Sequence, residues 1–274
     1  MLQPHPSKAL EYWFFKVNYQ GTALLVDWIC RRKTGAAVLR VSVHSPGGRE
    51  VLFLDHPAIL KDGAPELSMK GTSWSRGDVR WQLSLEASPA RIRPQIFPAE
   101  QMKLFDMSLV SAPTVVFDGW IEHHNQRYPV VEARGMLSHY WGRGLPQEWW
   151  WISANQFDNP DISIECTILR SRVWGLPILV PLGYFYYRNR AQSRLLISPP
   201  ARITVAGTPD AFEVRAGSLR GPQFALKAIG REYAALGDGI MNTLTGDLVL
   251  SERGKKVAHA WGSAALERRA ISNE

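Results

Sequence analysis

Cysteine is almost absent from this sequence, with only Cys30 and Cys166 among 274 residues. So few cysteines exclude a disulfide-stapled scaffold and a cysteine-rich zinc module. Long apolar runs are missing as well. The longest one, residues 173–187, is interrupted by Pro177 and Pro181 and is shorter than the roughly 20 residues that a membrane-spanning helix needs. The sequence therefore predicts a globular protein with its own hydrophobic core.

Targeting signals and nucleic-acid motifs are also lacking. Residues 1–8 do not show the basic stretch and apolar run of a signal peptide, so we expect a cytoplasmic protein with both cysteines reduced. The net charge is +7, but no basic helix or aromatic platform motif accompanies it, and no nucleic-acid partner is predicted. The same charge is compatible with peripheral contact with an anionic membrane. The sequence leaves the oligomeric state open.

Familiar catalytic and metal-binding signatures are absent too. There is no GxGxxG after a strand, no Walker loop, no HExxH and no GxSxG. His123 and His124 are adjacent, and on a strand their rings would point to opposite faces. We therefore predict no metal site.

What the sequence does contain is the two-residue alternation of β-strands. In residues 23–31, Leu24, Val26 and Trp28 share one face, and Asp27 lies on the other. Turn signals recur about every 8–12 residues, the rhythm of sandwiches and barrels. One short helix is expected over residues 98–109. Further strands are expected at residues 38–44, 51–54, 79–85, 115–124, 128–137, 149–157, 162–171, 183–187, 194–197, 202–206, 212–216, 223–228, 246–250 and 257–267.

Tryptophan is unusually frequent and unevenly placed. Eleven tryptophans occur, and ten of them lie in the first 174 residues. This shift in composition coincides with the proline-interrupted apolar run. It predicts a boundary between two β domains, residues 1–172 and residues 173–274.

The most informative segment is residues 149–157. On a strand, Trp149, Trp151, Asn155 and Phe157 share one face, while Trp150 points to the other. Three consecutive tryptophans cannot all face one core. At least one indole must therefore be covered by another layer, a partner or a ligand.

This region is similar to a known group of proteins. The sequence H-Y-W-G at 139–142, then L-P at 145–146 and W-x-W-x-x-x-N-x-F at 149–157, resembles the tocopherol cyclase family, the related carotenoid 1,2-hydratases and the lipocalin-like Diels–Alderases. E-Y-W-F-F-K at 11–16 is similar to the first strand of that superfamily. G-S-A-A-L-E at 262–267 is similar to its closing strand.

The resemblance implies two lipocalin-like antiparallel β-barrel or sandwich units with few short helices and an apolar pocket. It also implies chemistry on polyene, prenyl or polyketide substrates without a cofactor. Two departures leave the individual activity open. The acidic residue that the hydratases carry before Trp-Gly is missing at the matching position, and Tyr140 stands where the cyclases have asparagine.

From these observations we predict a cofactor-independent cyclase, hydratase or isomerase that acts on an apolar isoprenoid or polyketide-like molecule. Proton transfer to a double bond needs a donor in a dry pocket, and aromatic faces stabilise the resulting cation by about 2 kcal/mol or more when desolvated. The candidate catalytic residues are His139, Tyr140, Asn155, Asp27 and Asp158. The candidate substrate-binding residues are Trp13, Trp141, Trp149, Trp151, Gln156 and Phe157.

The alternative is a non-catalytic lipocalin-like carrier of a hydrophobic ligand. A carrier holds its ligand by burying apolar surface, at roughly 25 cal/mol per Å², and needs no convergent polar groups. A cyclase or hydratase should instead place a buried acid, histidine or amide against apolar walls.

Overall fold

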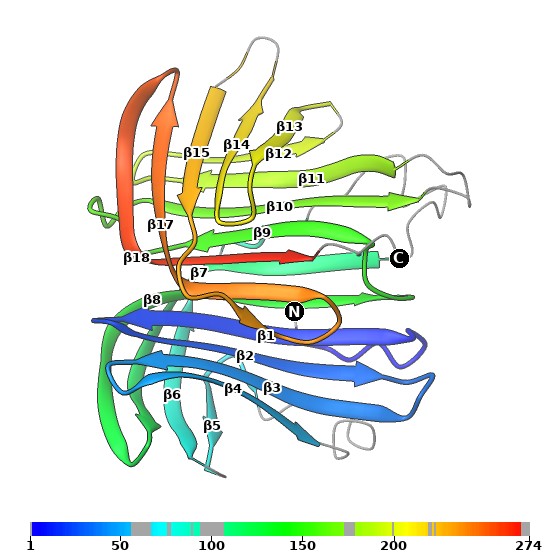
Figure 1. Cartoon of the computed structure of the whole chain (residues 1–274), viewed down its shortest axis with the longest axis vertical. Helices are drawn as coiled ribbons and strands as arrows, with labels where there is room; N and C mark the ends of the chain where they lie inside the picture. Colours follow the sequence, from blue (N-terminus) through cyan, green and yellow to red (C-terminus); the bar gives the residue numbers. More distant parts are fainter. Residues whose placement is uncertain are drawn as a thin grey trace. The chain divides into compact units, whose positions relative to one another are not determined.

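The computed structural model describes residues 2–55, 67–75, 78–88, 90–93, 107–172, 179–198, 200–218, 221 and 223–269. Within these ranges every helix or strand is a β-strand (Figure 1). The all-β class predicted from the alternation is therefore confirmed. The helix expected over residues 98–109 lies outside the described residues except for positions 107–109, which begin a strand. The described residues contain no helix long and apolar enough to cross a membrane.

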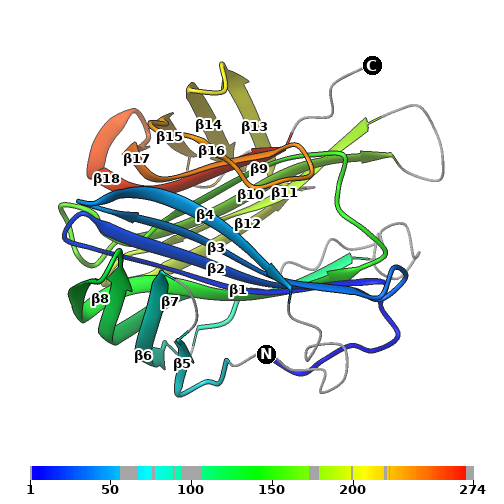
Figure 2. The same ribbon diagram turned by 60° about the horizontal axis from the view of Figure 1, so that its bottom comes forward.

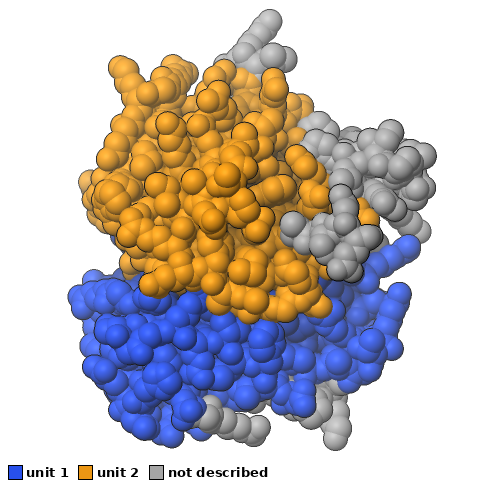
Figure 3. Space-filling view, viewed as in Figure 1, with its two compact units in different colours: residues 1–93, 107–145 blue, residues 94–106, 146–274 orange. Residues whose placement is uncertain are grey.

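The chain forms two compact units, coloured separately in Figure 3. The described residues of 2–93 and 107–145 belong to unit 1, and those of 146–269 to unit 2. This division differs from the boundary predicted after residue 172. The reason is hydrogen bonding: the strands at residues 148–172 pair with strands that follow them in the chain. The tryptophan-rich segment therefore begins the second sheet.

Unit 1 is a single sheet of eight antiparallel strands in the order β4-β3-β2-β1-β8-β7-β6-β5. The order begins at β4 and ends at β5, and the sheet curves into a half-barrel (Figure 2). Its strands are β1 (Leu10–Tyr19), β2 (Thr22–Arg31), β3 (Ala36–Ser45), β4 (Gly48–Asp55), β5 (Gly71–Trp74), β6 (Val79–Ala87), β7 (Met107–His123) and β8 (Gln126–Gly142).

Unit 2 is a ten-stranded antiparallel sheet in the order β12-β11-β10-β9-β18-β17-β15-β14-β13, with β16 paired to β17. Strand β13 also approaches β10, β11 and β12, so the sheet forms a nearly closed barrel (Figure 1). Its strands are β9 (Glu148–Ala154), β10 (Ser163–Arg172), β11 (Leu179–Arg188), β12 (Ser193–Ser198), β13 (Arg202–Gly207), β14 (Ala211–Gly217), β15 (Gln223–Ile229), β16 (Ala234–Ala235), β17 (Ile240–Glu252) and β18 (Lys255–Arg269). The two lipocalin-like units predicted from the sequence are confirmed.

One face of the first sheet forms the hydrophobic core of unit 1. Trp13 and Phe15 of β1 and Trp28 of β2 are fully buried in it. Each large side chain of this kind stabilises the fold by about 1.5–3 kcal/mol through burial. Because strand side chains alternate, the residues between them, including Lys16 and Asp27, lie on the opposite face.

The core of unit 2 divides the three consecutive tryptophans as predicted. Ile152 and Ala154 of β9 face this core, and Trp150 packs against it from the same side. Trp149 and Trp151 alternate with them and are buried on the other face of the strand. The second sheet therefore carries indole rings on both sides.

We predict that Gly135→Ala destabilises unit 1 strongly. Gly135 lies in β8, where an added Cβ would come 2.0 Å from the backbone oxygen of Lys16 in β1. A clash with a paired strand cannot be relieved by turning a side chain, so we expect a loss of about 2–3 kcal/mol in the free energy of unfolding. Urea denaturation measures it. Gly144→Ala is the control, because no atom lies within 4 Å of its added Cβ; equal losses in both variants would contradict the prediction.

Candidate functional site

A buried pair of polar side chains, Glu11 and His139, lies in the interior of unit 1. Strands β1 and β8 are neighbours, and their register places Trp13 opposite His139 and Glu11 opposite Trp141. His139 Nε2 lies 2.9 Å from Glu11 Oε1, and both residues are almost completely buried. Glu11 and His139 therefore lie on the same side of the sheet as the core residue Trp13.

The Glu11 carboxylate accepts hydrogen bonds from two further groups. Arg32 Nη2 donates to Oε2 at 2.7 Å, and the backbone N–H of His5 donates to Oε1 at 2.8 Å. Burial raises the pKa of Glu11, but the hydrogen bonds from His139, Arg32 and His5 outweigh it and lower the pKa overall. Glu11 is therefore ionised at neutral pH, and its charge is compensated inside the protein.

Aromatic rings surround Glu11 and His139. The Trp13 and His139 rings stack at 4.9 Å between centroids, and the His5 ring stacks on Trp141 at 4.0 Å. The structure thus brings together three predicted site residues, Trp13, His139 and Trp141. It places them in a packed core next to Glu11, which supports a structural role for the cluster.

The opposite face of the first sheet carries a second set of buried polar groups. Arg40 Nε donates to Asp27 Oδ2 at 2.8 Å, and both side chains are buried. Burial also lowers the pKa of Lys16 to about 7. Asp27, predicted as a proton donor, is thus held in an ion pair. Tyr140 lies on this face as well, and its hydroxyl donates to the Gly144 carbonyl at 2.5 Å.

The second sheet also has a buried face that carries polar groups. Two of the predicted tryptophans, Trp149 and Trp151, lie on it. The register places Trp151 of β9 between Glu267 of β18 and Thr167 of β10. Trp149, two residues before Trp151, donates from Nε1 to Glu267 Oε1 at 2.9 Å. Asn242 of β17 donates to the other carboxylate oxygen at 3.4 Å. Indole rings and a carboxylate are therefore neighbours on this face.

A second carboxyl group lies on the same face, fully buried. Glu165 of β10 is opposite Ser153 of β9 in the strand register, and the Tyr184 hydroxyl of β11 donates to its Oε1 at 2.5 Å. Burial, together with the nearby Glu165 carboxylate, raises the pKa of Tyr184 well above its ordinary value. The phenol thus stays protonated and acts as a hydrogen-bond donor. We call Trp149, Trp151, Glu165, Tyr184 and Glu267 the acid–indole face.

The remaining predicted site residues lie in different surroundings. Asn155 is fully buried, and its Oδ1 accepts a hydrogen bond from Ser153. Gln156 is half-buried, and Phe157 lies in the core of unit 2, not beside Trp149 as the strand pattern predicted, because β9 ends at Ala154.

Asp158 does not have the dry environment that its predicted role required. It is exposed, and it accepts backbone hydrogen bonds from His259 and Asn159. The His259 bond is the main cause that lowers the pKa of Asp158. The side chain is therefore an ionised cap of a turn, which is unsuitable for giving up a proton.

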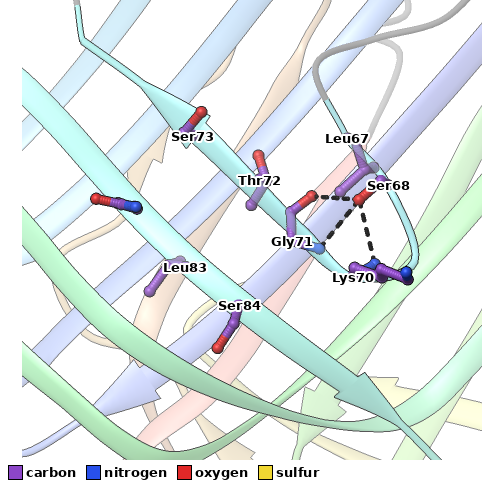
Figure 4. A pocket seen from close by; sticks show the side chains of 9 residues that line it. Leu67, Ser68, Lys70, Gly71, Thr72, Ser73, Leu83 and Ser84 are labelled. Carbon is purple, nitrogen blue, oxygen red and sulfur yellow. Dashed lines mark hydrogen bonds between the residues drawn. The ribbon is translucent and has the colours of Figure 1, made fainter.

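A pocket of about 560 Å³ lies beside the β5–β6 hairpin (Figure 4). Its lining is rich in hydroxyl and amide groups, including Thr72, Ser73 and Gln82. Ser68 Oγ donates to the Gly71 carbonyl and accepts from two backbone N–H groups at its rim. None of the predicted aromatic residues lines this pocket.

Two groups of side chains in the described ranges have metal-ligand chemistry. In the group His5, Glu11 and His139, the carboxylate already accepts from Arg32 and two other donors, which disfavours a cation there. The second group is Glu50, His123 and His124. The prediction that the two adjacent histidines point apart is wrong.

The reason for this correction is the backbone at His124. Strand β7 ends at His123, and His124 adopts a positive φ of 50° in the turn. Its ring therefore stacks on His123 at 3.9 Å between centroids.

Sequence reasoning did not select several of these site residues. Glu165 interrupts an apolar strand between Ile164 and Cys166, the same signal that selected Asp27, and could have been found by it. Glu11 and Glu267 were noted only as parts of motifs. Arg32 and Tyr184 carried no local signal, because only the strand register brings them to their carboxylates.

Comparison with known proteins agrees with this architecture. Residues 107–190 match the tocopherol cyclase-like family. This match confirms the resemblance inferred from residues 139–157, and it includes strands β9, β10 and β11 of the acid–indole face. An uncharacterised protein of Mycobacterium tuberculosis, in two strains, is 30% identical over 110 residues. That alignment covers 39% of this chain and 32% of the relative, about a third of its length.

Two solved structures share the fold over nearly the whole chain. CghA, determined with Sch210972, superposes with a TM-score of 0.68 at 8% identity and covers 98% of this chain and 90% of its own. Kievitone hydratase from Nectria haematococca gives a TM-score of 0.63 at 12% identity and covers 98% and 91%. At such low identity the likeness shows the fold alone.

We predict that Glu11→Gln destabilises the protein in a pH-dependent way. At pH 7 the loss should be about 3 kcal/mol, because the fully buried Glu11 carboxylate loses its ion pair with the partly exposed Arg32. The lowered pKa means that the carboxylate contributes stability above its ordinary value of 4.5. That contribution is lost as the pH falls through the lower value of the folded state.

Denaturation curves from pH 7 to pH 3 test this prediction. The difference between wild type and variant should shrink on acidification. Glu213→Gln is the control, since Glu213 pairs with the exposed Arg215 and should contribute little. A difference for Glu11→Gln that does not change with pH would show that the lost stability does not come from the ionised carboxylate.

Proposed function

We propose that this protein is a cofactor-independent enzyme that cyclises or hydrates an apolar small molecule on the acid–indole face of its second sheet. The observation that carries the proposal is the fully buried Glu165, hydrogen-bonded to Tyr184 on the same face as Trp149 and Trp151. A carrier needs only apolar walls. A buried acid beside aromatic rings is the arrangement that proton chemistry on an apolar substrate requires.

The comparisons support the same class of reaction. The matched family is tocopherol cyclase-like, and one protein of the same fold is a hydratase. The match includes Trp149, Trp151, Glu165 and Tyr184. We take an isoprenoid or polyketide-like molecule as the substrate class, since both combine apolar surface with reactive double bonds.

The proposed chemistry requires the Glu165 carboxyl group to take up a proton first, and its complete burial favours the neutral form. It transfers its proton to one carbon of a substrate double bond, which leaves a tertiary cation on the other carbon. The faces of Trp149 and Trp151 stabilise this cation, by about 2 kcal/mol or more in a desolvated site. A hydroxyl of the substrate then closes a ring, or water adds. The proton released by the attacking oxygen returns to the Glu165 carboxylate.

Tyr184 positions the carboxyl group for this step. Its raised pKa keeps the phenol protonated, so that it donates to Oε1 and fixes the orientation of Glu165. The same phenol could polarise a substrate carbonyl in a pericyclic ring closure, which needs positioning and no proton transfer. Glu165 is essential in the first mechanism and dispensable in the second.

The decisive experiment is native mass spectrometry of the protein purified from its own host, followed by incubation with the molecule that co-purifies. We expect wild type to convert its ligand into a product of equal mass for cyclisation, or heavier by one water for hydration. Glu165→Gln should bind the ligand and slow its conversion about 10²–10⁴-fold. Chromatography coupled to mass spectrometry follows the conversion.

The other outcomes discriminate among mechanisms. Conversion at the wild-type rate by Glu165→Gln would eliminate the proton-transfer mechanism and leave the pericyclic one. A ligand that binds to both proteins and is never converted would identify a carrier. A matching melting temperature for the variant shows that the amide has preserved the fold.

We further predict that Trp151→Leu weakens ligand binding, whereas Trp150→Leu does not. The two residues are adjacent in β9, but Trp151 lies on the acid–indole face and Trp150 packs against the core of unit 2. Loss of the Trp151 ring should reduce affinity about tenfold, because an aromatic contact contributes roughly 0.5–1.5 kcal/mol beyond its area. Fluorescence titration with the co-purified ligand measures it. Equal weakening in both variants would contradict the assignment of the face.

A further inference from the structure

A cluster of two histidines and one glutamate lies in unit 1, where two hairpins meet. Glu50 follows the β3–β4 turn, and His123 and His124 stand at the β7–β8 turn. Neither β3 nor β4 is next to β7 or β8 in the sheet order. The cluster therefore joins two parts of the half-barrel that backbone hydrogen bonds do not join.

The geometry points to a binding site for a divalent transition-metal ion, such as Zn²⁺, held by Glu50, His123 and His124. Their potential ligand atoms lie within 4.8 Å of one another. Two ligands on one zinc ion, each about 2.1 Å from it, lie up to about 4.2 Å apart. A shift of less than an ångström toward the ion is thus enough. His124 is exposed, so its ring has room to make such a shift.

His123 is oriented as a metal-binding histidine would be. Its Nε2 faces Glu50 Oε2 at 3.2 Å, and its Nδ1 lies 2.9 Å from the hydroxyl of Ser45. When Nε2 binds a metal, Nδ1–H can donate to Ser45 Oγ, the type of outer hydrogen bond that orients ligating histidines.

The positive φ of His124 is the second feature that favours a site. A non-glycine residue rarely adopts this conformation, and here it turns the second imidazole to the same side as the first. In an ordinary strand the two rings would diverge. Imidazole nitrogens with one carboxylate and exposed positions for water suit zinc and similar ions, and do not suit magnesium.

The test uses the full-length protein after treatment with a chelator, titrated with Zn²⁺ by calorimetry, with melting temperature as a second readout. We expect one ion to bind per chain and the melting temperature to rise. Glu50→Gln and His124→Gln should each weaken binding at least tenfold. Ser45→Ala should weaken it about 10–100-fold through loss of the outer hydrogen bond. Mg²⁺ should produce neither heat nor stabilisation.

A variant of the Glu11 cluster shows whether zinc binds there instead. His5→Ala should bind Zn²⁺ like wild type; loss of binding in that variant would move the ion to the Glu11 cluster and overturn the proposal. Wild-type affinity in Glu50→Gln would show that the histidine pair alone attracts zinc, and would also overturn it. Absence of saturable binding to wild type would do the same. His124 and the Glu50 side chain are surface groups, so both variants should fold, and their metal-free melting temperatures check this.

Discussion

Burial of both faces of the central strands is the constraint on which this structure depends. In β1 and β2 nearly every residue is buried, whichever side of the sheet it points to. One side can be filled with aliphatic and aromatic groups. The other side carries Lys16, Asp27 and Arg40, whose polar atoms must find partners inside the protein. The same holds for the second sheet, where Glu165 and Asn155 are fully buried.

The two buried carboxyl groups, Glu11 and Glu165, accept hydrogen bonds from different kinds of donor. Glu11 accepts from a guanidinium group, an imidazole and a backbone N–H, so its negative charge is balanced and its position is fixed. Such a group stabilises a fold but has little freedom to give or take a proton. Glu165 shares a short hydrogen bond with a phenol, a neutral donor. We therefore assign a structural role to Glu11, while our proposal gives the chemistry to Glu165, which shares its face of the sheet with Trp149 and Trp151.

The fold was largely predictable from the sequence, since alternation of apolar residues follows directly from strand geometry. The site was less so. The faces of Trp149, Trp150 and Trp151 follow from local periodicity, and the structure agrees. Which carboxylate meets which donor depends on register between strands distant in sequence, as with Glu11 and His139, 128 residues apart. The start of the second sheet depends on the same kind of pairing: composition changes after residue 172, but hydrogen bonding starts the second sheet at β9.

The pairing of β9 with β18 also governs the order in which the molecule can be assembled. During synthesis on the ribosome, β9 emerges more than a hundred residues before its partner. Until then one edge of the tryptophan-rich strand has no neighbour, and non-local pairing of this kind is slow and prone to aggregation. The wait is shorter in unit 1, because β8 can pair with β1 when only about half of the chain has been synthesised. A nascent chain can thus complete its first sheet early, whereas the second waits for its final strand.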